Sequence, residues 1–196
     1  MKKGLITIAV IAVIALALFG WVKNSYNGLV AGEEKVESAW AQVENVYQRR
    51  ADLIPNLVAT VKGYAAHESE TLQAVIDARA KATGITVDAS NLSEEALAKY
   101  QSAQGELSQA LGRLIAVSEA YPDLKANENF KDLQAQLEGT ENRISTERMK
   151  FNETAQGYNT NLRSFPTNII AGLFNFEKKG YFKAAEGAEN APKVEF

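Results

Sequence analysis

The longest apolar segment of the chain stands at its start. After Lys2 and Lys3, an apolar run without a charged residue extends from Gly4 to Val22. A helix of about 19 residues is roughly 28 Å long, close to the ~30 Å hydrocarbon core of a bilayer. The run therefore predicts a transmembrane segment over residues 1–23, with apolar positions at Leu5, Ile6, Val10, Val13, Leu16, Phe19 and Trp21.

The same segment has a second interpretation as a cleavable signal peptide. Ala15-Leu16-Ala17 has the small-x-small form that signal peptidases cut. The apolar run continues past this point from Leu18 to Val22, however, and so exceeds the apolar region of a typical removable signal. We therefore favour an uncleaved signal-anchor.

Basic residues around the segment indicate its orientation. Lys2 and Lys3 precede the span, whereas Lys23 stands alone after it until Lys35. Because basic residues concentrate on the cytoplasmic side of a membrane, this bias predicts a single-pass protein with a cytoplasmic N-terminus. The body would lie outside the cytoplasm, in a periplasm or the equivalent space.

The body of the chain shows helical periodicity from residue 24 onward. Apolar residues recur at spacings of three and four, and glycine and proline are sparse within the long segments. The recurring positions include Val36, Trp40, Val43, Tyr47, Leu57, Val61, Tyr64 and Leu72. This pattern predicts an all-α fold, with an up-and-down four-helix bundle over residues 24–165.

The first part of the bundle could be one long helix or two. In one continuous helix, Arg50 would fall on the apolar stripe and Pro55 in the helix interior. An unpaired buried charge costs several kcal/mol, and an interior proline ~3 kcal/mol. We therefore predict a turn at residues 49–52 between helices over 24–49 and 53–83, with Asp52 as the N-cap of the second.

Two further helices complete the predicted bundle. Ser93 is followed by Glu94 and Glu95, which is typical of a helix start, and Pro122 should stop that helix. The last helix should begin near Asn127 and end near Arg163.

The last of these helices carries a heptad pattern. Six large apolar residues stand seven apart: Phe130, Leu137, Ile144, Phe151, Tyr158 and Phe165. The companion positions become polar after Leu133, at Thr140, Glu147, Thr154 and Asn161. These residues either form the wetter edge of a bundle helix, or form a coiled-coil seam through which copies of the chain self-associate.

An aromatic segment follows the bundle at residues 166–182. Its large apolar residues are Ile169, Ile170, Phe174, Phe176, Tyr181 and Phe182. The final helix should return this segment to the membrane, where it either lies in the bilayer interface or folds back on the base of the bundle. Residues 183–196 have the composition of a flexible tail.

Composition excludes several classes of function. The 196 residues contain 21 Lys and Arg against 24 Asp and Glu, and a net charge of −3 provides no broad positive field for nucleic acid. The absence of cysteine excludes disulfides and thiolate metal sites. The single histidine, His67, shares a helix face with Glu70, which would hold a metal only weakly. We expect no enzyme, cofactor, metal site or small-molecule substrate.

One charged cluster invites two interpretations. Arg49, Arg50 and Asp52 surround the predicted turn, at the end of the bundle farthest from the membrane. Arg50 could pair with a carboxylate of a neighbouring helix in a structural role. Alternatively, the cluster could dock a partner at this tip, for which the planar guanidinium is well suited.

Several segments closely resemble the LemA family. They include Tyr47 to Val58 (YQRRADLIPNLV), Val61 to Glu68 (VKGYAAHE), Ala78-Arg79-Ala80, Tyr121 to Ala126, Leu137 to Ile144, Phe151-Asn152 and Phe165-Pro166. The resemblance implies a bacterial membrane protein with an N-terminal span and a helical bundle, and we expect that membrane to be the inner (cytoplasmic) one. One relative belongs to the machinery of magnetosome membrane formation. The family has no agreed catalytic set, so the resemblance transfers no site residue.

These features together suggest two functions. The first is a non-enzymatic, membrane-anchored scaffold or adaptor that self-associates and organises membrane or membrane-protein partners. The second is a sensing accessory of membrane signalling that holds a ligand or peptide between its helices.

Overall fold

The computed structural model describes residues 2–184, and this part of the chain is helical without any strand. The all-α prediction is therefore confirmed. The helices are α1 (Lys2–Tyr64), α2 (Ser69–Gly84), α3 (Glu94–Val117), the 3-10 turn η1 (Ser118–Ala120), α4 (Pro122–Ala126), α5 (Glu128–Arg163) and α6 (Thr167–Leu173). The predicted tail lies outside the described residues from position 185 onward.

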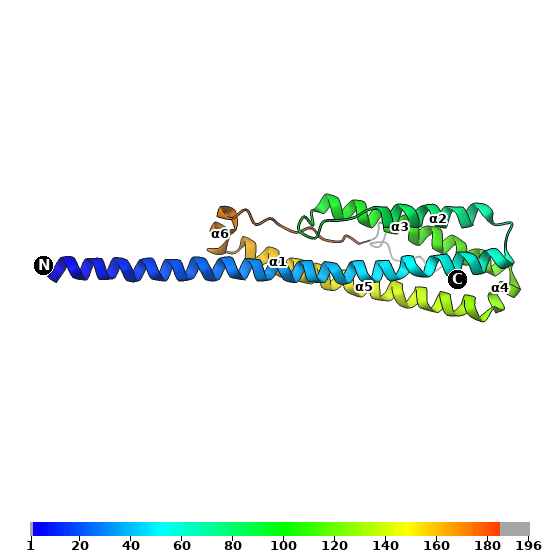
Figure 1. The fold of residues 1–196 in the computed structure, drawn as a ribbon, viewed down its shortest axis with the longest axis horizontal. Helices are drawn as coiled ribbons and strands as arrows, with labels where there is room; N and C mark the ends of the chain where they lie inside the picture. Colours follow the sequence, from blue (N-terminus) through cyan, green and yellow to red (C-terminus); the bar gives the residue numbers. More distant parts are fainter. Residues whose placement is uncertain (1, 185–196) are drawn as a thin grey trace, which may run out of the picture.

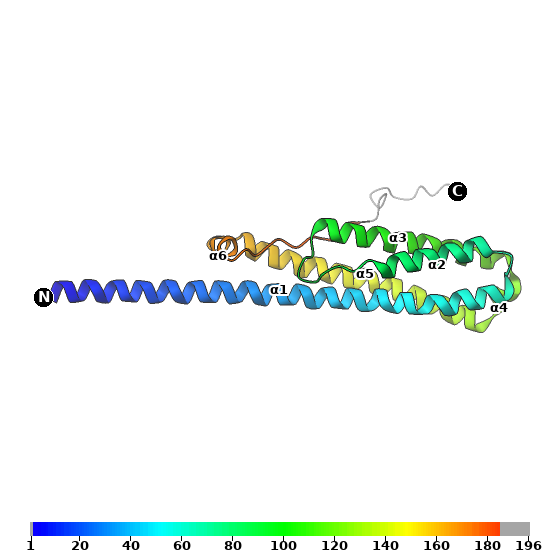
Figure 2. The ribbon, with the colours of Figure 1, turned by 45° about the horizontal axis from the view of Figure 1, so that its top comes forward.

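One helix is much longer than the bundle to which it belongs. The N-terminal part of α1 projects from the bundle, while α2, α3 and α5 run alongside its C-terminal part in alternating directions (Figures 1 and 2). α5 packs against α1, and α2 packs against α3. The short α4 lies at the end farthest from the projecting segment, and α6 lies at the opposite end of the bundle.

The predicted turn at residues 49–52 is wrong. α1 continues through this region to Tyr64 as one helix of 63 residues, so the predicted boundary between helices at 49 and 53 does not exist. The chain turns only at residues 65–68, before α2. Asp52 caps no helix, and its carboxylate accepts a hydrogen bond of 2.7 Å from the Gln48 side chain within α1.

The predicted turn rested on the free-energy costs of an interior proline and of an unpaired buried arginine. Long-range contacts remove both costs. Pro55 lies inside α1 and has no N–H to donate to the carbonyl of Ala51, four residues earlier. The Arg79 side chain of α2 donates to that carbonyl instead, at 2.8 Å. Arg50 is buried, and its guanidinium lies 2.6 Å from a Glu141 carboxylate oxygen. A proline and an arginine are therefore both accommodated inside one helix.

The interior of the bundle divides into two clusters of buried residues. The distal core, near α4, includes Ile54, Leu57, Val61, Leu72, Val75, Leu107, Leu111, Leu114, Leu124, Phe130 and Leu137. The proximal core, near α6, includes Leu29, Val36, Trp40, Val43, Tyr47, Leu92, Leu97, Tyr100, Ile144, Phe151, Tyr158, Ile170 and Phe182. The heptad residues of α5 therefore contribute to both cores, except Phe165, which lies beyond the end of the helix and is exposed.

Local signals placed the starts of two helices correctly. The Ser93 hydroxyl accepts a hydrogen bond from the backbone N–H of Ala96 at the start of α3. The Asn127 side chain accepts one from the N–H of Phe130 at the start of α5. α3 ends at Val117, and Pro122 is the first residue of α4.

The role of Arg79 is testable by a double-mutant cycle. Arg79→Ala should lower the free energy of unfolding by about 1–3 kcal/mol, because it leaves the buried Ala51 carbonyl without a donor. In a Pro55→Ala background the loss should be smaller, since the new N–H can donate to this carbonyl. Denaturant unfolding followed by circular dichroism in detergent measures both effects.

Lys81→Ala is the matched control, because Lys81 lies on the same helix in an exposed ion pair with Glu106. It should cost less than about 1 kcal/mol in either background. Equal losses for Arg79→Ala with and without Pro55 would contradict the assigned role.

Candidate functional site

A buried polar layer separates the two cores. At its centre is Arg50, which is only 1% exposed. Its guanidinium donates to the Glu141 carboxylate at 2.6 Å and to the Ser108 hydroxyl at 2.7 Å. It also donates to the backbone carbonyl and the side-chain oxygen of Gln104. These partners lie on α3 and α5, so the layer joins three helices through one side chain.

The layer compensates the cost of burying a charge. A buried cation is tolerated when it is both paired and hydrogen-bonded. Glu141 is 44% exposed and keeps contact with water, while the ring of Tyr47 lies 5.1 Å below the guanidinium. Burial raises the pKa of the Tyr47 phenol, and the nearby Arg148 and Arg50 oppose this rise. The tyrosine therefore stays neutral beside the arginine.

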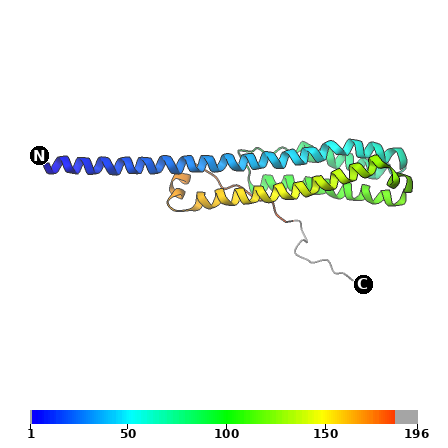
Figure 3. The same ribbon diagram turned by 90° about the horizontal axis from the view of Figure 1, so that it is seen from below.

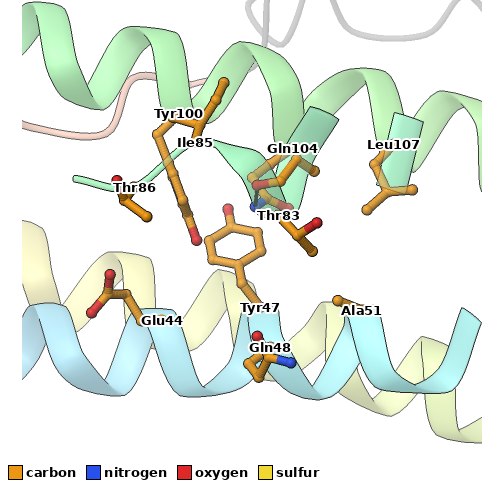
Figure 4. A pocket seen from close by; sticks show the side chains of 11 residues that line it. Glu44, Tyr47, Gln48, Ala51, Thr83, Ile85, Thr86, Tyr100, Gln104 and Leu107 are labelled. Carbon is orange, nitrogen blue, oxygen red and sulfur yellow. Dashed lines mark hydrogen bonds between the residues drawn. The ribbon is translucent and has the colours of Figure 1, made fainter. Parts of the chain in front are cut away.

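A small cleft adjoins this layer, between α1, α3, the end of α2 and the loop that follows it. Its volume is about 150 Å³, and it contains the side chains of Glu44, Tyr47, Tyr100, Gln104, Thr83 and Thr86 (Figure 4). The rings of Tyr47 and Tyr100 meet edge to face, with centroids 5.3 Å apart. Burial raises the pKa of the Glu44 carboxyl and of the Tyr100 phenol. Polar atoms from three helices and a loop thus converge on one small space.

An extended segment that follows α6, here named the strap (residues 176–183), completes the proximal half of the bundle. Three side-chain amides hold its backbone, each binding both the N–H and the carbonyl of one residue. Asn159 binds Lys179, Asn152 binds Phe182, and Gln101 binds Lys183, at distances of 2.8–3.1 Å. Asn152 and Asn159 lie on α5 and Gln101 on α3, so the strap runs between these helices.

Side chains of the strap are part of the proximal core. Phe182 stacks on Trp40 with ring centroids 5.9 Å apart and meets Phe151 edge to face at 5.5 Å. Lys179 is buried, pairs with Glu33 at 2.6 Å and donates to the Ser90 carbonyl. A Cβ on Gly180 would lie 2.8 Å from the backbone nitrogen of Glu94. The strap is therefore closely fitted to the bundle.

The aromatic segment predicted to contact the membrane divides into two groups. Ile170 and Phe182 are buried in the proximal core, and Phe176 and Tyr181 pack partly against it. Ile169 and Phe174 are exposed, as are Phe165 and Leu173 nearby. Part of the segment thus folds back on the base of the bundle. The amides of Asn152, Asn159 and Gln101, which hold this fold-back, were not identified from the sequence because isolated polar residues on a helix resemble a solvent-facing surface.

The predicted tip cluster does not lie at a hairpin. Arg49, Arg50 and Asp52 lie inside α1, in its C-terminal half. Arg50 is buried and pairs with a carboxylate of a neighbouring helix through its terminal guanidinium nitrogens, as the structural interpretation required, whereas Arg49 and Asp52 are exposed. The actual hairpin contains His67 and Glu68, and Glu68 accepts a hydrogen bond from the Tyr121 hydroxyl. Within residues 2–184, no group of three His, Cys, Asp or Glu side chains is placed to bind a metal.

The residues of the predicted self-association seam lie in the interior of the bundle at one end of α5 and on its surface at the other. Thr140 is buried and donates to the Gln136 carbonyl, so it is not available to a second copy. Glu147 pairs with Lys150 at 2.8 Å, and Thr154 donates to the Lys150 carbonyl. Asn161 is exposed. A seam through Glu147, Thr154 and Asn161 remains a prediction.

The projecting part of α1 has the properties of a membrane anchor. Its apolar side chains are exposed, including Leu5, Ile6, Val10, Val13, Leu16 and Phe19, whereas Trp21 packs partly against the proximal core. Among the described residues, α1 alone is long and apolar enough to cross a membrane. This helix suggests single-pass membrane anchoring.

Comparison with known proteins shows which family and which proteins the chain is similar to. A model of the LemA family matches residues 39–196. The magnetosome protein MamQ 2 of Paramagnetospirillum magneticum is 27% identical over 199 aligned residues, which cover 92% of this chain and 72% of the relative. The protein LemA of Metamycoplasma hominis is 24% identical over 160 residues, which cover 82% of this chain and 69% of the relative.

The polar layer yields a stability prediction. Arg50→Met should lower the free energy of unfolding by about 3 kcal/mol, because it leaves the partners of a buried charge unsatisfied. Glu141→Gln should cost less, since Glu141 is partly hydrated and Arg50 retains its other acceptors. Arg49→Met, at an exposed neighbour, should change stability by less than about 0.5 kcal/mol. Denaturant titration in detergent measures all three, and equal effects of Arg50→Met and Arg49→Met would contradict the prediction.

Proposed function

Because this chain belongs to the LemA family and its apolar N-terminal helix enters the bundle without a break, we propose that it is a membrane-anchored scaffold or adaptor. In this proposal the protein is not an enzyme. It self-associates, and it organises membrane or membrane-protein partners.

The observation that carries the proposal is the continuity of α1. From Lys23 to Tyr64 the helix rises roughly 60 Å at about 1.5 Å per residue. No flexible linker separates the apolar part from the bundle, and Arg50 connects the C-terminal half of the helix to α3 and α5. Such a helix would hold the hairpin at residues 65–68 at a set distance from the membrane, which suits a spacer or docking platform.

Two further features support the orientation and assembly in this proposal. The lysines that precede the apolar run favour a cytoplasmic N-terminus and an extracytoplasmic body in a bacterial inner membrane. The exposed part of the polar edge of α5 provides a surface on which a second copy could pack. Relatives named as magnetosome proteins are in keeping with a structural role in a larger assembly.

Particle mass in nanodiscs tests self-association. The full-length protein should occupy particles as more than one copy, as measured by mass photometry. Asn161→Arg should shift the distribution to fewer copies, because it places like charges across the proposed seam. Gln156→Arg is the control at a similar height on another face of α5, and it should leave the distribution unchanged. A strictly monomeric wild-type protein would refute self-association.

The cleft beside the polar layer favours a second candidate function, ligand sensing. A carboxylate beside two tyrosine rings suits a small organic cation, which both the charge and the aromatic faces attract. Because Gln104 lines the cleft and accepts a hydrogen bond from Arg50, an occupant would contact one residue of the polar layer.

Tetramethylammonium is a suitable probe for this cleft. Calorimetric titration of the full-length protein should give saturable heat that Glu44→Gln abolishes and Glu34→Gln preserves, since Glu34 is exposed and does not line the cleft. The absence of saturable binding to the wild-type protein would count against this candidate.

A further inference from the structure

An exposed apolar patch lies at the end of the bundle near the projecting helix. It consists of Phe165, Ile169, Leu173 and Phe174, which are 83%, 55%, 70% and 47% exposed. Ile169 and Leu173 belong to α6, Phe174 directly follows it, and Phe165 stands two residues before it. Large apolar groups gathered on an otherwise polar surface indicate contact with a nonaqueous partner.

The orientation of α6 presents this patch away from the bundle. Ile170 and Ala171 are buried in the proximal core, while Ile169 and Leu173, one turn apart, lie on another face of the helix and are exposed. α6 crosses the end of the bundle from which α1 projects (Figures 1 and 3). The exposed face is therefore not needed to close the core.

Contacts with α1 set the height of the patch along the anchor. The ring of Phe174 meets that of Tyr26 edge to face, with centroids 4.9 Å apart. Trp21 and Val22, at the end of the apolar run, pack partly against the proximal core. Four residues of helix rise only about 6 Å, so Tyr26 is less than one and a half turns beyond Val22. The patch is thus level with the end of the anchor.

We propose that this patch inserts into the headgroup and acyl boundary of the membrane that the anchor spans. The inference rests on the proposed anchoring, and it adds a second lipid contact made by specific residues. The bilayer is the occupant that the position dictates, because the patch continues the apolar surface of α1 at the level where a membrane would end. Lys23, which precedes Tyr26 by three residues, and Arg163, which precedes Phe165 by two, are exposed and would meet anionic headgroups.

This second contact would fix the orientation of the bundle relative to the membrane. A single helix can tilt and rotate in a bilayer, whereas an attached apolar patch at the interface restricts both motions. Ile170 and Phe182, which the sequence also suggested as membrane contacts, are excluded from this role because they are buried.

Site-directed spin labelling tests the contact in the full-length protein. The chain has no cysteine, so Phe165→Cys, Ile169→Cys and Leu173→Cys can each carry a single nitroxide. In vesicles of equal parts phosphatidylcholine and phosphatidylglycerol, accessibility to oxygen relative to a water-soluble nickel complex should rise several-fold over Met149→Cys. Met149 is a matched control because it is 57% exposed on the side of α5, away from α6. Circular dichroism confirms that each labelled variant remains helical.

A label at Val13→Cys separates failure of this inference from failure of the anchoring. If Val13 reports lipid while the patch labels behave like Met149, the second contact is refuted and the anchor stands. If Val13 itself reports water, the anchoring is refuted. If both reagents are excluded from the patch labels, protein covers the patch and the lipid contact is again refuted.

Discussion

The burial of the Arg50 guanidinium among acceptors of two neighbouring helices is the constraint on which the rest of the structure depends. An arginine inside an apolar stripe would break or expose a helix if it lacked partners. Here α3 and α5 supply a carboxylate, a hydroxyl and two amide oxygens to one guanidinium. α1 therefore remains a single helix through both cores, and the apolar N-terminal segment is joined to the bundle without a hinge.

The proximal half of the bundle is completed by an extended segment, the strap, and not by a polar layer. α2 ends at Gly84, and both the loop that follows it and the extended strap contribute side chains to the proximal core. Side-chain amides of α3 and α5 satisfy the backbone of the strap at three points, much as a neighbouring strand would. This arrangement turns the chain back along the bundle after α6, and it leaves α6 at the end beside the anchor.

Features set by neighbours in sequence were predictable. The caps at Ser93 and Asn127 use contacts within three residues, and the heptad of α5 follows from helix geometry. The turn at residues 49–52 was wrong for the opposite reason, because each penalty was judged locally. Arg79 satisfies the carbonyl that Pro55 leaves free, and Glu141 neutralises Arg50 from 91 residues away. Neither partner can be recognised before the helices are arranged in space.

The sequence by itself determined the helical class, the length and apolar character of the anchor segment, and the resemblance to a family. These follow from composition, period and local motifs, which act over one or two helical turns. Only the tertiary structure decided where the first hairpin lies and which aromatic residues after Pro166 are buried. That segment has no single period, so Phe182 and Leu173 look alike in sequence. Their burial differs because Phe182 packs against Trp40, whereas Leu173 lies on the outer face of α6.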